Sequence, residues 1–270
     1  MNLIVHCGGR HVAREGLRKC DTPPPTETWH PIPHHRLLEQ IEHALVASGN
    51  GGASGNGGGG GGGGELRIVN QAHAISRDGA RYFGLLEVAN GHVDADWALV
   101  LGLRNSHDQS FPAALAVGSN VLCCDNLSFS GEVTLARKHT RHIERDLPEL
   151  VDRAVGKLGD LRYTQQQRID SYKQTEVDDR HAHDLMIRAV DHHVAPVTVL
   201  PQVIAQWREP AHAEFAEDGK TAWRLFNAFT EALKGRSLEQ LPRRTQALHG
   251  LLDRTCCAAT PASINRALAV

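Results

Sequence analysis

Polar side chains that could carry out chemistry are concentrated in one short segment between two apolar runs. Residues 104–110 read Arg-Asn-Ser-His-Asp-Gln-Ser. An arginine with an asparagine suits a phosphate or a carboxylate, and a histidine beside an aspartate suits proton transfer. The segment supplies five candidate site residues, which are Arg104, Asn105, Ser106, His107 and Asp108.

Two further candidates, Asp125 and Asn126, end the apolar run that begins at Asn120. The runs 97–103 and 120–126 are short and uncharged in their interiors, which favours buried strands. If these two strands pair, both groups of candidates lie on one rim of a sheet. The alternative is that Asp108, Asp125 and Asn126 cap turns, since these residue types commonly bond to nearby backbone.

A basic segment follows, with the sequence Arg-Lys-His-Thr-Arg-His over residues 137–142. Side chains of this kind can contact the phosphates of a nucleic acid. The candidate nucleic-acid-binding residues are Arg137, Lys138, His139 and Arg141. The alternative is a polar helix start in which Thr140 is the N-cap.

The chain contains 17 histidines, and several of them lie near carboxylates. On a helix, His181, Asp184, Asp191 and His192 fall near one face, and imidazole with carboxylate can bind a transition metal. Arg188 lies in the middle of that face and would repel a metal ion. We therefore expect an Asp184–Arg188 ion pair there, and neither a metal site nor a cofactor.

The elements that must position these residues change type along the chain. A helix is expected directly after Pro33, where Leu37, Leu38 and Ile41 begin an apolar face. His34, His35 and His43 are expected to face solvent. Strands are expected at 66–75, 81–88, from 97, at 121–125 and at 129–133, with turns at Arg77-Asp-Gly79 and Asn90-Gly91. These strands form an antiparallel meander.

Apolar residues recur at helical spacing in the second half. Helices are expected over 143–158, 179–193, 221–234 and 241–252, and 197–207 is a further short apolar segment that Pro196 and Pro201 break. The fold class is thus α+β, with an antiparallel β meander in the N-terminal half followed by a mainly helical C-terminal half. The predicted regions are a loosely ordered N-terminal arm (1–28), an α+β core (29–160) with a flexible glycine-rich loop (49–64), and a helical C-terminal region (161–270).

Composition excludes several protein classes. The formal net charge is −2, so no global basic field attracts nucleic acid or anionic membrane. No apolar run reaches the length of a membrane span, and no signal peptide is expected. The six cysteines include two adjacent pairs but no CxxC spacing. A reduced, cytoplasmic protein without a membrane partner is expected.

The segments GLRNSHDQS, VLCCDNLSFSGEV and RKHT occur in this order, after TPPPTETWHPIPHHRLLEQIEHAL and RDGARYFGLLEV. Together they resemble the domain-of-unknown-function family numbered 932, also called the phage/plasmid-like family. The resemblance covers roughly residues 22–160, and the polyglycine stretch inside it departs from the family pattern. It implies a protein of phages, plasmids or genomic islands, and it transfers no catalytic residues.

Three hypotheses about function remain open from the sequence. The first is a non-catalytic accessory factor of a mobile element that binds single- or double-stranded DNA. The second is a hydrolase or nuclease-like enzyme that uses Arg104, His107, Asp108 and Asp125. The third is a structural or interaction module, which could be oligomeric, whose polar signature only holds turns.

Overall fold

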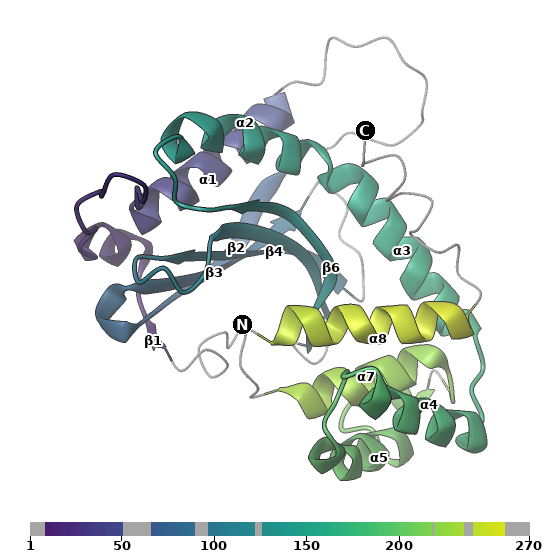
Figure 1. Cartoon of the computed structure of the whole chain (residues 1–270). Coiled ribbons are helices and arrows are strands. Elements are labelled where there is room, and N and C mark those ends of the chain that lie inside the picture. Colours follow the sequence, from purple (N-terminus) through teal and green to yellow (C-terminus); the bar gives the residue numbers. More distant parts are fainter. Residues whose placement is uncertain are drawn as a thin grey trace.

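An antiparallel sheet forms the centre of the molecule (Figure 1). The computed structural model describes residues 9–50, 66–89, 97–121, 126–217, 219–234 and 240–256. Within these ranges the sheet has six strands, each hydrogen-bonded to the next in chain order. They are β1 (Arg10–His11), β2 (Arg67–Ser76), β3 (Arg81–Ala89), β4 (Trp97–Ser106), β5 (Ala113–Val121) and β6 (Asn126–Arg137). The predicted meander is confirmed.

One strand boundary differs from the sequence prediction. The run 120–126 was expected to be a single strand, but β5 ends at Val121 and β6 begins at Asn126. Val121 and Asn126 face each other across the two strands, so the chain reverses between them. The polar pair Asp125 and Asn126 is typical of a turn, but the sequence prediction placed both residues at the end of one strand. The predicted turn at Asn90-Gly91 lies outside the described residues.

Helices make up most of the second half of the described chain. They are α1 (His34–Asn50), α2 (Ile143–Gly156), α3 (Leu158–Gln174), α4 (Asp179–Asp191), α5 (Leu200–Arg208), α6 (Ala213–Glu217), α7 (Ala222–Leu233) and α8 (Leu241–Thr255), with short 3-10 turns η2 (Arg14–Lys19), η3 (Arg77–Gly79) and η4 (Val197–Val199). In Figure 1, α1 and α2 cover one face of the sheet. The helices α4, α5, α7 and α8 form a separate group beside the sheet, away from α1 and α2. The predicted α+β class is confirmed.

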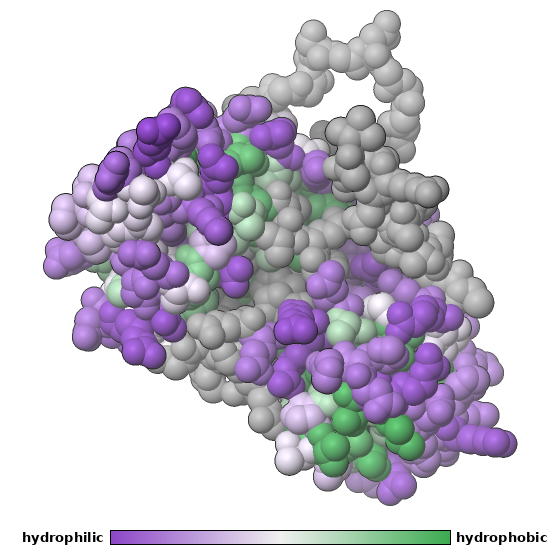
Figure 2. Space-filling model, viewed as in Figure 1, coloured by the Kyte–Doolittle hydropathy of each residue, from purple (hydrophilic) through white to green (hydrophobic). Residues whose placement is uncertain are grey.

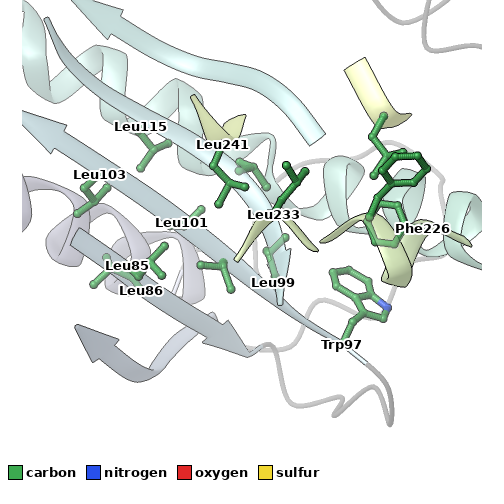
Figure 3. Packing of buried hydrophobic residues seen from close by; sticks show 14 of the residues in the cluster. Leu85, Leu86, Trp97, Leu99, Leu101, Leu103, Leu115, Phe226, Leu233 and Leu241 are labelled. Atoms are coloured by element: carbon green, nitrogen blue, oxygen red, sulfur yellow. The ribbon is translucent and has the colours of Figure 1, made fainter. Parts of the chain in front are cut away.

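The sheet and the C-terminal helices share one hydrophobic core. Alternate residues of β4, including Leu99, Leu101 and Leu103, belong to the same buried cluster as Leu233 of α7 and Leu241 of α8 (Figure 3). The predicted apolar face of α1 is also buried in this cluster. The C-terminal helices therefore help to hold the strands in place, and the strands help to hold the helices.

Part of the N-terminal arm is packed, in contrast to the loose order expected for residues 1–28. Residues 10–11 pair with β2, and Leu17 in η2 is fully buried. Arg14 forms an ion pair with Glu42 of α1. These contacts attach the arm to α1 and the sheet. Residues 1–8 lie outside the described chain, as do residues 51–64 of the expected flexible glycine-rich loop.

The surface of the C-terminal helices carries exposed apolar side chains. Ile187 of α4 is 63% exposed, and Val197 of η4 is 65% exposed. Figure 2 shows apolar residues gathered on this part of the molecule, in the region of α5. Contiguous apolar patches of this kind often mark surfaces that contact other macromolecules.

A pair of glycine substitutions tests the packing of the sheet. A Cβ atom at Gly84 would lie 2.3 Å from Oη of Tyr82, a fully buried side chain. We expect Gly84→Ala to force Tyr82 to move and to lower the free energy of unfolding by about 1–3 kcal/mol. Gly250 in α8 has nothing within 4 Å of its added Cβ. Gly250→Ala should therefore raise the free energy of unfolding by up to about 1 kcal/mol. Urea denaturation measures both changes, and equal urea midpoints for the two variants would contradict the prediction.

Candidate functional site

Asn105 lies at the end of β4, and its amide joins three parts of the chain. Its side chain is fully buried. The Nδ2 atom donates to the Ile32 carbonyl at 2.9 Å and to Nδ1 of His34 at 2.9 Å. The Oδ1 atom accepts from Nε2 of His139 at 2.7 Å. Both amide protons and the amide oxygen are therefore used.

The hydrogen bonds of His34 require a neutral imidazole. Its Nε2 lies 2.7 Å from the Gly79 carbonyl, which can only accept, so Nε2 carries the proton. Nδ1 then accepts from Asn105. Burial, with a smaller contribution from nearby His107, lowers the pKa of His34 to about 3. The same two causes lower the pKa of His139 to about 4.

His107 stacks on His34 and faces carbonyl oxygens with both ring nitrogens. The two rings are 3.9 Å apart and nearly parallel. Nδ1 lies 3.1 Å from the Asp21 carbonyl, and Nε2 lies 2.9 Å from the Ile32 carbonyl. The ring thus links β4 to the N-terminal arm. We refer to Asn105, His34, His107 and His139 as the Asn105 cluster.

The histidines at the start of α1 differ in environment. His34 was expected to face solvent, but it is only 1% exposed, so that prediction was wrong. His35 is partly buried, whereas His43 is exposed as expected. His34 is the first residue of α1, and the turn at η3 brings the Gly79 carbonyl to its ring. The apolar face of the helix could not indicate this contact, because it depends on a distant turn.

Ser106 and Asp108 hold the turn between β4 and β5. Ser106 Oγ donates to the Phe111 carbonyl at 2.6 Å and accepts from the Phe111 amide. Asp108 accepts from Ser110 and, at 2.7 Å, from Nε of Arg81. Burial alone would raise the pKa of Asp108, but these hydrogen bonds lower it. Both residues thus have the turn-stabilising contacts of the alternative hypothesis.

The predicted rim of polar residues does not form. Arg104 pairs across the sheet with Ala114 near the start of β5, whereas Asn126 pairs with Val121 at its end. Seven residues of a strand separate these positions by about 23 Å. Arg104 lies over the ring of Phe111, 5.4 Å from its centroid. Asp125 lies outside the described residues.

The candidate enzyme residues point in different directions. Arg104 and Asn105 are consecutive in β4, so their side chains point to opposite faces of the sheet. His107 is only 6% exposed and faces the interior with Asn105. Asp108 lies on the surface in its ion pair with Arg81. The geometry therefore does not bring Arg104, His107 and Asp108 into one pocket.

The basic segment divides into buried and exposed side chains. Arg137 forms an ion pair with Asp146, and His139 is buried against Asn105. Lys138 and Arg141 are exposed, and neither pairs with a carboxylate among the described residues. The expected N-cap at Thr140 is wrong, because α2 begins at Ile143 after a turn in which the Thr140 carbonyl accepts from the Ile143 amide.

A hollow of about 370 Å³ lies beside Arg141. Proline residues from the arm and the first residues of α2 form its walls. We refer to it as the proline hollow, and it is lined by Thr22, Pro23, Pro24, Pro25, His30, Pro31, Pro33, Arg141, Ile143 and Glu144. Its polar lining groups are a guanidinium, an imidazole, a hydroxyl and a carboxylate, so it offers both donors and acceptors.

A second buried polar group joins α3 to α8, and the sequence analysis missed it. Arg168 Nε donates to Asp253 at 3.1 Å, and Tyr172 Oη donates to the same carboxylate oxygen at 2.6 Å. Burial raises the pKa of Tyr172 and lowers that of His249, whose Nδ1 lies 3.1 Å from the Tyr172 hydroxyl. The available signal was spacing, since Arg168 with Tyr172 and His249 with Asp253 are both four residues apart.

The helix that carries several histidines has the expected ion pair. Arg188 lies 3.8 Å from Asp184 in α4, as predicted. Within the described ranges, no group of three or more His, Cys, Asp or Glu side chains is arranged to hold a metal ion. None of the helices described is long and apolar enough to cross a membrane.

Comparison with known proteins gives one family match. A family model described as "Domain of unknown function (DUF932)" matches residues 63–254. The matched span contains the sheet from β2 onward and nearly all of α8, and therefore includes Asn105, His139 and Asp253. It leaves out α1 and the arm, which supply His34 and the proline walls of the hollow. No curated protein and no solved structure matches the chain.

Removal of the Asn105 amide should destabilise the protein. Asn105→Ala leaves His34 Nδ1 and His139 Nε2 without their buried partner, and it removes one of the two side-chain nitrogen atoms that face the Ile32 carbonyl. We expect the free energy of unfolding to fall by about 1–3 kcal/mol. Gln174→Ala, at an exposed position of α3, is the control and should have little effect. Equal urea midpoints for the two variants would contradict a structural role of Asn105.

Acid should destabilise the fold through His34. The folded pKa of about 3 lies below the ordinary value, so the unfolded chain binds a proton that the folded chain does not. The contribution of His34 to the free energy of unfolding is fully present above about pH 6.5 and is lost as the pH falls toward the folded pKa. Over this range the free energy of unfolding should fall by up to about 1.4 kcal/mol per pH unit. Denaturation between pH 7.5 and 5 would measure it. His34→Gln should reduce the slope, and exposed His43→Gln should preserve it.

Proposed function

The chain belongs to the DUF932 family, which is a family of unknown function, and from this premise we propose that it is a non-catalytic DNA-binding accessory protein. The motifs identified in the sequence predicted this family correctly. The matched domain covers residues 63–254 rather than 22–160. The family's association with phages and plasmids, as implied by those motifs, makes DNA of a mobile element the partner to test first.

The environment of the polar signature supports a role without turnover. Asn105 and Ser106 are fully buried, and His107 is nearly so. Their hydrogen-bonding groups are used within the protein, mostly by backbone carbonyls and neighbouring imidazoles. A substrate would have to displace these contacts before it reached any of the three side chains.

The observation that carries the DNA-binding proposal is the mounting of Lys138 and Arg141. Between these two exposed cations, the side chain of His139 is held by Asn105, and its carbonyl accepts from the His30 amide at 3.0 Å. Residues 138–141 are therefore held by both the side chain and the backbone carbonyl of His139. Cations on a rigid segment lose less conformational entropy when they bind phosphates than cations on a mobile loop.

Self-association would strengthen such binding. Two cations per chain make few phosphate contacts, so one copy would bind weakly. The apolar residues gathered in the region of α5 (Figure 2) form a surface through which copies could associate. In an oligomer the same two cations would repeat along a strand, and the affinity would rise with the number of copies engaged.

A structural or interaction module is the second candidate, favoured by the Asn105 cluster itself. Its buried contacts join the arm, β4 and the segment after β6, which is what a purely structural signature would do. In this case Lys138 and Arg141 would be ordinary surface residues, so DNA binding separates the two candidates.

DNA binding across a salt titration tests the proposal. We expect the wild-type protein to bind labelled oligonucleotides at low salt. For each copy that engages the strand, the logarithm of the affinity should fall with the logarithm of salt concentration with a slope of about −1.4 to −1.8, because about two phosphates are contacted. Lys138→Ala with Arg141→Ala should remove most of this dependence.

The control is Arg180→Ala, which removes an exposed cation at the start of α4, in the C-terminal helices. It should leave both the affinity and the slope unchanged. Absence of wild-type binding to single- and double-stranded DNA at low salt would refute the proposal and leave the structural role.

A further inference from the structure

Five prolines give the proline hollow rigid walls, and polar side chains make up the rest of its lining apart from Ile143. Pro23, Pro24 and Pro25 line one part, and Pro31 and Pro33 contribute from the segment that leads into α1. Proline rings fix the backbone angle φ, so these walls lose little entropy when a ligand packs against them. Such walls suit a flat group whose faces are apolar.

The polar groups of the hollow are of two kinds. Arg141 is exposed and can bind a phosphate. Glu144 would repel a phosphate, but its carboxylate can accept a hydrogen bond from an exocyclic amino group. His30 and Thr22 add groups that can donate or accept. This combination suits a ligand with an anionic end and a neutral hydrogen-bonding end.

Unused hydrogen-bonding groups lie next to this site in the chain. Trp29 Nε1 and Thr140 Oγ1 are buried atoms without a hydrogen-bond partner in the part of the chain that the structure describes. Trp29 precedes the lining residue His30, and Thr140 precedes Arg141. The ring of Trp29 packs edge-on against His139, so Trp29 contacts the segment that the Asn105 cluster anchors, and Thr140 is part of that segment. This side of the molecule has hydrogen-bonding capacity that its own contacts do not use.

We propose that the proline hollow accepts one unstacked base of a single-stranded nucleic acid, while Arg141 contacts an adjoining phosphate. The volume of about 370 Å³ falls at the lower end of the range of small-molecule pockets, and a single nucleotide is a ligand of that size. A base within a duplex is stacked on both faces and cannot enter without being flipped out. The hollow therefore selects single strands over duplexes.

This inference rests on the proposed DNA-binding function, and three probes separate the two. They are a labelled oligo-dT strand, a strand of equal length with abasic sites throughout, and a duplex that contains the oligo-dT sequence. The abasic strand keeps the phosphates and lacks the bases. We expect wild-type protein to bind oligo-dT about tenfold more tightly than either the abasic strand or the duplex, as one stacked base would provide.

A variant that fills the hollow provides the second measurement. Thr22→Phe places a ring among the prolines and should lower the affinity for oligo-dT to that for the abasic strand, which itself should not change. Gln174→Phe, at an exposed position of α3, is the matched control and should preserve the tenfold preference. Thermal melting of both variants reports whether they fold.

The outcomes distinguish the two proposals. Equal, salt-dependent binding of oligo-dT and abasic strands by the wild-type protein would overturn the base-binding hollow and leave the phosphate contacts intact. Tighter binding of the duplex than of oligo-dT would also overturn it. No binding of any probe at low salt would refute the DNA-binding function itself. The comparison of strands uses wild-type protein, so it stands even if Thr22→Phe does not fold.

Discussion

The amide of Asn105 is the interaction on which the arrangement of the N-terminal half depends. A buried amide must use its donors and its acceptor, because each unsatisfied group costs about 1–3 kcal/mol. Here the partners come from the segment before α1, from the first residue of α1 and from the segment after β6. These partners are distant in sequence, so the amide is satisfied only when all three segments are in place.

The start of β4, the strand that contains Asn105 near its end, is held by a different set of polar contacts. Trp97 at the start of β4 donates to Gln166 of α3 at 2.7 Å, and Gln165 contacts Ser119 of β5. The helix α3 is in turn joined to α8 through Arg168 and Asp253. A one-residue slip of β4 would move every one of its side chains to the other face. Polar contacts at both ends therefore fix its register more strictly than its leucines alone.

The sequence predicted those features that depend on local periodicity. The apolar faces of α1 and α7 and the order of the strands followed from spacing, and the structure confirms them. The burial of His34 did not follow, because it depends on the Gly79 carbonyl from a turn far along the chain. The polar rim failed because the chain reverses between Val121 and Asn126, which places Asn126 at the opposite end of β5 from Ala114, the partner of Arg104.

Residue types that suit catalysis have a different use when they are buried and fully bonded. His107 has both the ring nitrogens and the neighbouring aspartate of a proton-transfer site, but its nitrogens face carbonyls and Asp108 points to the surface. The residues proposed to bind DNA lie where the buried cluster meets solvent. His139 is that junction, because its ring is held by Asn105 while Lys138 before it and Arg141 after it are exposed. The contacts that stabilise the Asn105 cluster therefore also fix the positions of the two exposed cations.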